Sequence, residues 1–186
     1  MLLPLIRRNV LAFILATASI LSAPIAYAGK ASTIDKDVDA AMTQLVKGSP
    51  KAKSLKKSAA AVLVFPKIVK AGFIVGGQYG EGALRVKGKT IGYYSIVAGS
   101  YGLQAGGQSF GYALFFMKQS ALDYLRKSKG WSVGSGPSVV VLDKGAATST
   151  TSTTITQDVV AIPFNQRGLM AGLGLEGSKI SPISPD

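Results

Sequence analysis

The sequence predicts an α+β domain, in which a bent antiparallel or barrel-like β-sheet rich in glycine carries two N-terminal helices and one helix between strands. Twelve of the 22 glycines lie between Ala71 and Leu114, among β-branched and aromatic residues. Glycine weakens a strand unless a bulge, a bend or a close approach of two backbones requires it. Glycine at this density inside strands therefore indicates a sheet that bends strongly.

This glycine-rich region nearly repeats itself. Gly72–Gln78 reads GFIVGGQ and Gly102–Gln108 reads GLQAGGQ, and each block leads through further glycines to an Ala-Leu pair. We expect two equivalent strand pairs. A nucleotide site is not expected, because Gly88-Lys89-Thr90 lacks the glycine that a P-loop needs upstream, and Gly172–Gly177 has no helix and second strand after it.

Residues 1–28 are expected to be a cleaved signal peptide. Arg7 and Arg8 precede an apolar run from Val10 to Leu21, and Ala26-Tyr27-Ala28 supplies the small residues that a signal peptidase accepts. The run is too short for a comfortable transmembrane helix. The arginine pair also resembles a twin-arginine signal, so the export route stays open. We expect cleavage after Ala28, one domain over residues 29–186, and export to the bacterial periplasm or cell envelope.

Composition excludes several chemistries. The mature chain would hold 19 basic and 9 acidic residues, a net charge of +10, and the sequence has neither histidine nor cysteine. Disulfides, histidine-based triads and the usual zinc sites are therefore absent, and no cofactor is expected. Glu81 and Glu176 are the only glutamates. A carboxylate pair can cleave a glycoside, but it needs a defined separation that the sequence does not give. We expect both to hydrogen-bond the backbone of glycine-rich bends, and we expect no enzyme.

Two helices are predicted at the start of the mature chain. Ser32–Val46 places its apolar residues on one helical face, with Ser32 or Thr33 as cap and with Asp35 and Asp37 in the first turn. Those apolar residues are Ile34, Val38, Ala41, Met42, Leu45 and Val46. A second, basic helix is expected to run to about Ala59, capped by Ser49 and with Pro50 at its first position.

Strands and one further helix follow. Ala60–Phe65 is a short apolar run that Pro66 is expected to end, Lys87-Gly88-Lys89 marks a hairpin, and Tyr112–Met117 is apolar throughout, so both of its faces must be covered. A helix is expected over Gln119–Lys129, with Ser120 as cap and with Leu122 and Leu125 facing the core. The remaining expected strands are Ser138–Leu142, Ile155–Ile162 and Gly168–Glu176, after which the Ser-Pro pairs end the ordered chain.

The most suggestive chemical feature is a run of lysines. Seven lysines and no acid lie between Asp39 and Glu81. Such a run is often only a solvated face, but near an anionic membrane each basic residue contributes on the order of 1 kcal/mol of binding. The lysines expected to bind lipid are Lys51, Lys53, Lys56, Lys57, Lys67 and Lys70. Nucleic acid is not expected, because the chain carries an export signal and shows no recognition helix or stacking motif.

The glycine motifs resemble those of the SYLF domain. They are Lys70-Ala71-Gly72-Phe73, Gly76-Gly77, Gly80-Glu81-Gly82, Gly102–Gln108 and the closing Gly168–Ser178. The resemblance covers about Ala31–Pro182 and points to an exported bacterial branch of that family. It implies a lipid-binding module; several members recognise phosphoinositides, and some eukaryotic members bind actin. An exported protein does not meet cytoplasmic actin, so the expected partner is anionic phospholipid at a membrane surface.

The sequence therefore predicts an exported phospholipid-binding protein that is captured electrostatically through a lysine-rich helix and the strand after it. The alternative is a structural or interaction protein of the cell envelope that recognises another protein or an anionic polysaccharide.

Overall fold

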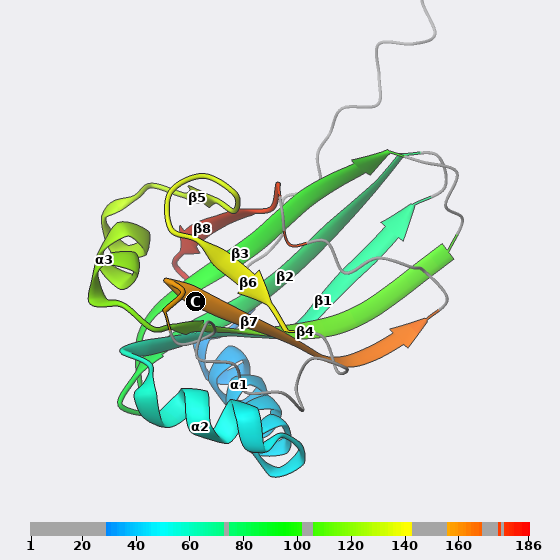
Figure 1. Cartoon of the computed structure of the whole chain (residues 1–186). Coiled ribbons are helices and arrows are strands. Elements are labelled where there is room, and N and C mark those ends of the chain that lie inside the picture. The colour runs from blue at the N-terminus through cyan, green and yellow to red at the C-terminus, as the bar shows by residue number, and fades with distance from the viewer. Residues whose placement is uncertain (1–28, 73–74, 102–105, 143–155, 169–174, 176) are drawn as a thin grey trace, which may run out of the picture.

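The computed structural model describes residues 29–72, 75–101, 106–142, 156–168, 175 and 177–186. Within these ranges it has three helices and eight strands (Figure 1). The helices are α1 (Ala31–Gly48), α2 (Pro50–Ser58) and α3 (Gln119–Lys127). The strands are β1 (Ala61–Gly72), β2 (Val75–Val86), β3 (Lys89–Tyr101), β4 (Gly106–Phe116), β5 (Trp131–Ser132), β6 (Val139–Val141), β7 (Val159–Gly168) and β8 (Lys179–Ile183).

All eight strands form one curled sheet in the order β5-β8-β3-β2-β1-β4-β7-β6 (Figure 1). Every neighbouring pair is antiparallel except β6 and β7, which run parallel. The predicted α+β class, the two N-terminal helices and the helix between strands are confirmed. The prediction of a wholly antiparallel sheet is wrong at this one edge.

The sheet separates two hydrophobic cores, and strand β4 contributes to both. Tyr112, Leu114 and Phe116 point to the face that also holds Leu122 and Leu125 of α3. Ala113 and Phe115 point to the opposite face, where α1 and α2 pack. Residues 112–116 are completely buried, as the unbroken apolar run predicts. Met117, at the end of the run, is partly buried.

Pro66 does not end strand β1, contrary to the prediction. The strand continues to Gly72, and its pairing with both neighbouring strands shifts register around Pro66. A bulge accommodates a residue that has no N–H to donate to the ladder. Across from it, Gly82 leaves no space for a side chain, because a Cβ would collide with the carbonyl oxygen of Val64. The bulge in β1 thus accounts for the glycine at position 82 of β2.

The Gly-Gly-Gln ends of the two glycine blocks, residues 76–78 and 106–108, lie on either side of strand β1. Lys70 is opposite Gln78 of β2 and also opposite Gln108 of β4, and Gly72 is opposite Gly76 and Gly106. The expected equivalence of two strand pairs is wrong, because β1 and β2 form a hairpin whereas β3 and β4 are separated by both of those strands. The repeat therefore marks two strands that flank a common partner.

The ends of the helices confirm the predicted cap of α2 and contradict the other predicted caps. Ser49 accepts a hydrogen bond from the backbone N–H of Ala52, and Pro50 begins α2, as predicted. The other predicted caps are wrong: α1 follows Lys30 and α3 follows Lys118, neither with a side-chain cap, and the first turn of α1 contains no acid. The predicted hairpin is confirmed, since Lys87 and Gly88 both have positive φ and join β2 directly to β3.

The C-terminal prediction needs a correction as well. Ser181 and Pro182 do not follow the ordered chain but lie in β8, opposite Ser95 and Tyr94 of β3. Pro182 lacks an N–H, yet β8 is a short strand near the edge of the sheet, where proline is tolerated. The predicted signal peptide, the serine- and threonine-rich segment 146–155 and most of the predicted strand Gly168–Glu176 lie outside the described residues.

Candidate functional site: a lysine surface on the second helix

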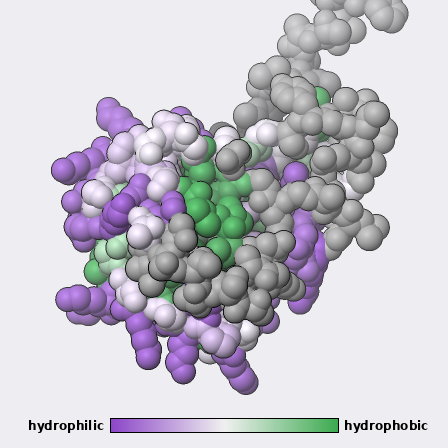
Figure 2. Space-filling model, viewed as in Figure 1, coloured by the Kyte–Doolittle hydropathy of each residue, from purple (hydrophilic) through white to green (hydrophobic). Residues whose placement is uncertain are grey.

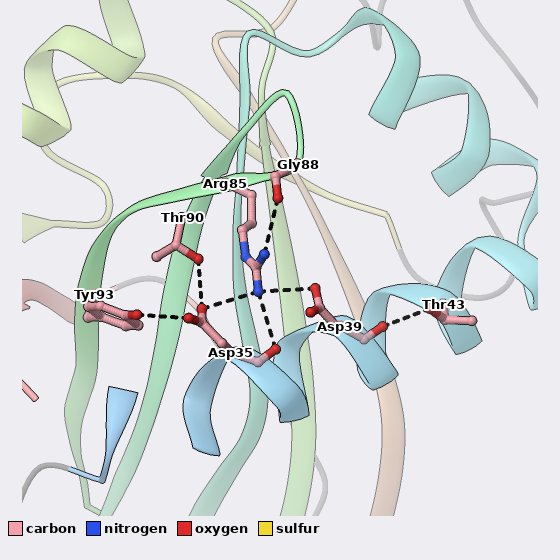
Figure 3. A network of polar contacts seen from close by, with 7 residues as sticks. All are labelled: Asp35, Asp39, Thr43, Arg85, Gly88, Thr90 and Tyr93. Carbon is pink, nitrogen blue, oxygen red and sulfur yellow. Dashed lines mark hydrogen bonds and ion pairs between the residues drawn. The ribbon is translucent and has the colours of Figure 1, made fainter. Parts of the chain in front are cut away.

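Helix α1 is fixed to the β2–β3 hairpin by a network around Arg85 (Figure 3). One nitrogen of its guanidinium group, Nη2, lies 3.1 Å from Oδ1 of Asp35 and 3.0 Å from Oδ1 of Asp39. Asp35 also accepts hydrogen bonds from Thr90 Oγ1 (2.6 Å) and Tyr93 Oη (2.9 Å). Burial, followed by the hydrogen bond to Asp35, raises the pKa of Tyr93. Asp35, predicted to interact with the helix dipole, therefore orients α1 on the sheet instead.

Helix α2 packs beside α1 and presents unpaired lysines. Lys53, Lys56 and Lys57 are exposed, whereas Ala52 and Leu55 on the opposite side of the helix are buried. None of the three has an ion-pair partner among the described residues. Figure 2 shows hydrophilic side chains projecting from the region of the molecule that α1 and α2 occupy. These ammonium groups are open to an external anion.

Two more exposed lysines extend this group: Lys47 near the end of α1 and Lys87 in the turn between β2 and β3. Like the three of α2, they have no ion-pair partner within the described ranges. We call the five residues Lys47, Lys53, Lys56, Lys57 and Lys87 the α2 lysine surface.

A groove lies between the two N-terminal helices. Its volume is about 630 Å³, and Met42, Val46 and Pro50 give it an apolar wall. Lys47, Lys53 and Lys56 stand around it. A second cavity, of about 450 Å³, lies between Lys56 and Lys57 on one side and Lys87 on the other, and reaches Val62 and Val64 of β1. Both hollows combine apolar walls with cations, which suits a ligand that has an anionic head and an apolar part.

The other predicted lipid-binding lysines lie elsewhere. Lys51 is only 6 % exposed, so its side chain is not presented to a membrane. Lys67 is exposed but lies beyond the bulge of β1, beside the start of α1. Lys70 is three residues further along an extended strand, which places it on the opposite face of the sheet. The structure thus brings together Lys53, Lys56 and Lys57, and does not group Lys51, Lys67 or Lys70 with them.

Sequence reasoning left Lys47 and Lys87 out of the predicted site. Lys47 belongs to the same acid-free run and lies just before the helix break at Gly48-Ser49-Pro50, so the sequence does carry a signal for it. Lys87 has no such signal, because it is separated from α2 by the whole of β1 and β2. The hairpin turn brings it beside the end of α2.

Glu81, which was expected to hydrogen-bond the backbone of a glycine-rich bend, bonds one backbone N–H and one tyrosine hydroxyl. Its Oε2 accepts from the backbone N–H of Gly29 at 2.8 Å, and its Oε1 accepts from the hydroxyl of Tyr79 at 2.6 Å. Burial, reinforced by Glu81, raises the pKa of Tyr79 to about 12. Glu176 lies outside the described residues. Within those residues, no three His, Cys, Asp or Glu side chains are placed to hold a metal ion.

Residues 97–184 match the model of the Ysc84 family, described as Las17-binding protein actin regulator. This match is consistent with the SYLF-domain resemblance that the glycine motifs predict. The matched segment begins in β3, so α1 and α2 precede it. A comparison with curated proteins found no match. No helix in the described part of the chain is both long enough and apolar enough to span a membrane.

Proposed function

We propose that this protein is an exported phospholipid-binding protein that associates with anionic membrane surfaces through the α2 lysine surface. The observation that carries the proposal is the row of Lys53, Lys56 and Lys57, exposed and without ion-pair partners in the described structure, beside a groove with an apolar wall. The match of residues 97–184 to a family described as a binding protein supports it.

Capture begins with charge. Each lysine that approaches an anionic leaflet contributes on the order of 1 kcal/mol, so the five residues together supply about 5 kcal/mol before any apolar contact forms. Salt weakens this attraction, because the screening length falls to about 8 Å at physiological ionic strength. Contact of Met42 and Val46 with the glycerol and upper acyl region then adds a contribution that salt does not screen.

Co-sedimentation with liposomes tests the proposal. The exported protein is mixed with vesicles of phosphatidylcholine alone and with vesicles that also contain phosphatidylglycerol. Binding to the anionic vesicles only is expected. The triple variant Lys53→Glu, Lys56→Glu and Lys57→Glu should bind them at least about a hundredfold more weakly, from about 1 kcal/mol per lysine.

The matched control reverses the same number of charges on the other side of the sheet. Arg126, Lys127 and Lys129 are exposed at the end of α3 and just after it. Replacing these three with glutamate changes the net charge by the same amount. Binding that falls equally in both triple variants would show a response to net charge alone and would refute the assignment to α2.

A second candidate function follows from the family description, which names a protein partner. In that case the α2 lysine surface recognises an acidic protein or an anionic polysaccharide of the cell envelope. Absence of binding to both kinds of vesicle would favour this alternative over a lipid module.

A further inference from the structure

Glu81 lies where the start of the described chain meets the sheet. The backbone nitrogen of Gly29 is 2.8 Å from Oε2 of Glu81, and Tyr79 occupies the other carboxylate oxygen at 2.6 Å. Gly29 is separated from Glu81 by 52 positions and stands two residues before α1. The contact therefore joins the segment just before helix α1 to strand β2.

The position of Gly29 suits a residue without a side chain. A Cβ at this position would lie 3.0 Å from Oε2 of Glu81 and 3.7 Å from Ile34. The first of these distances is tighter than ordinary van der Waals contact, so a larger residue would press on the carboxylate. The nitrogen of residue 29 and the carboxylate thus approach each other without an intervening group.

The surroundings favour a positive charge at this nitrogen. Asp37 of α1, Lys67 of β1, and Tyr79 and Glu81 of β2 are the titratable groups that line the cavity of about 320 Å³ beside Gly29. Asp186 approaches from the C-terminal segment, where its backbone oxygen accepts a hydrogen bond from the N–H of Ala31 at 3.1 Å. The lining of the cavity thus holds two carboxylates, Asp37 and Glu81, and one lysine, Lys67, while Lys30 follows Gly29 in the chain and is exposed.

We propose that Glu81 is the binding site for the α-ammonium group of Gly29, which is created when the signal peptide is cleaved after Ala28. In this step a signal peptidase adds one water across the Ala28–Gly29 peptide bond. The carbonyl carbon of Ala28 takes the hydroxyl group of the water and the nitrogen of Gly29 takes its remaining hydrogen, which breaks the C–N bond. The new carboxylic acid then releases a proton to solvent and the new amine takes one up, so that at neutral pH the products are a carboxylate on Ala28 and an ammonium group on Gly29. The existing N–H···O contact becomes an ion pair.

Processing thereby strengthens the contact that holds the start of α1 against the sheet. A charge-assisted hydrogen bond is about twice as strong as a neutral one, and the partly buried carboxylate is less screened than one in open water. The uncleaved chain has only an amide at this position. Cleavage of the signal peptide is thus coupled to the docking of helix α1 on the sheet. This role of Glu81 is independent of lipid binding.

The test uses the full chain, exported by a bacterial host and purified from it. Mass spectrometry is expected to show a chain that begins at Gly29. Reductive methylation with ¹³C-formaldehyde then labels its amines, and the dimethylated α-amine, which keeps one proton, is followed by NMR as the pH is raised. It is distinguished from the lysines because a free α-amine titrates near pH 8 and lysine near pH 10. We expect its midpoint to lie clearly above 8 in the native protein and to fall by about one pH unit in Glu81→Gln.

The control is Asp37→Asn, which removes a carboxylate from the wall of the same cavity without touching Gly29, and should move the midpoint much less. If Glu81→Gln does not fold, as judged by circular dichroism, Glu81→Asp withdraws the charge by one methylene and should also lower the midpoint. An α-amine that titrates identically in the native protein and the folded Glu81 variant would overturn the proposal, as would a mature chain that begins at another residue. Neither result would bear on the liposome measurement.

Discussion

Arg85 and the lysines of α2 lie on the same side of the sheet, but Arg85 is paired with carboxylates and the lysines are not. Arg85 lies between two carboxylates, with Nη2 at 3.1 Å from Asp35 and 3.0 Å from Asp39. Lys53, Lys56 and Lys57 have no carboxylate partner among the described residues. The difference separates two uses of positive charge. A paired and half-buried guanidinium orients a helix, whereas an unpaired and hydrated ammonium group can exchange water for an external phosphate.

The largest expected effect is the loss of stability when the paired cation, Arg85, is removed. Arg85→Ala leaves Asp35 and Asp39 facing each other and removes the hydrogen bond to the carbonyl oxygen of Gly88. We expect the free energy of unfolding to fall by about 2–3 kcal/mol, measured by urea denaturation. Lys53→Ala, which removes an unpaired cation, should change the free energy of unfolding by less than about 0.5 kcal/mol. Similar losses in the two variants would abolish the distinction between the two kinds of cation.

A smaller loss is expected when the network loses only the charge of Asp35. Asp35→Asn keeps the shape of the side chain but weakens its bonds to Arg85, Thr90 and Tyr93, and should cost about 1–2 kcal/mol. The variant should also lower the pKa of Tyr93, because Asp35 contributes to raising it after burial. Ultraviolet difference spectroscopy of the phenolate measures this change. An unchanged tyrosine titration would mean that burial alone sets the pKa.

The stability of the protein at alkaline pH tests the hydrogen bond between Tyr79 and a second carboxylate, that of Glu81. The pKa of Tyr79 is raised from 10.0 to about 12, first by burial and then by Glu81. Because the folded-state pKa exceeds the unfolded value, this stabilisation is complete below pH 10 and is lost as the pH rises toward 12. Tyr79→Phe should therefore show a smaller decline of stability over this range, measured by urea denaturation at each pH. A decline as steep as that of the native protein would argue against the assignment.

The smallest expected effect is at Asp158, whose pKa is lowered from 3.8 to about 2. The main cause is its hydrogen bond with Lys118, at 2.8 Å, followed by hydrogen bonds from Ser138. Since the folded-state pKa lies below the unfolded value, the stabilisation is present above pH 3.8 and is lost as the pH falls toward 2. Asp158→Asn should flatten the acid side of the stability profile. Asp123→Asn, on helix α3, removes a carboxylate that has no lysine or arginine partner among the described residues; it is the control and should change the profile less.

Local signals predicted local features of the fold. Ser49 and Pro50 began α2 as expected, because a cap and a proline at the first helical position act within one turn. Tyr112–Phe116 required cover on both faces, because every position in it is apolar. Pro66 misled the prediction, since the register shift that accommodates it depends on both neighbouring strands. The β8 strand was missed for the same reason, as its partner, β3, lies some eighty residues earlier in the chain.

The candidate site was predictable only in part. The acid-free run pointed to Lys53, Lys56 and Lys57, which the structure places together on α2. It also contained Lys67 and Lys70, and a period of two along a strand was enough to show that these two lie on opposite faces. Lys51 is buried, although nothing in a short basic helix distinguishes it from its neighbours. Lys87 reaches the site through the hairpin, across a distance in sequence that no local pattern spans.

By itself, the sequence determined the class of fold, the positions of the three helices, the hairpin at Lys87-Gly88 and the resemblance to the SYLF domain, because each depends on periodicity, turn chemistry or a motif within a few residues. The tertiary structure alone decided which charges are paired. Asp35 bonds Arg85, Thr90 and Tyr93 from fifty or more residues away, and Glu81 bonds Gly29 across a similar distance. A charge is neutralised by whatever lies within about 4 Å of it, and that neighbourhood exists only after the sheet has formed.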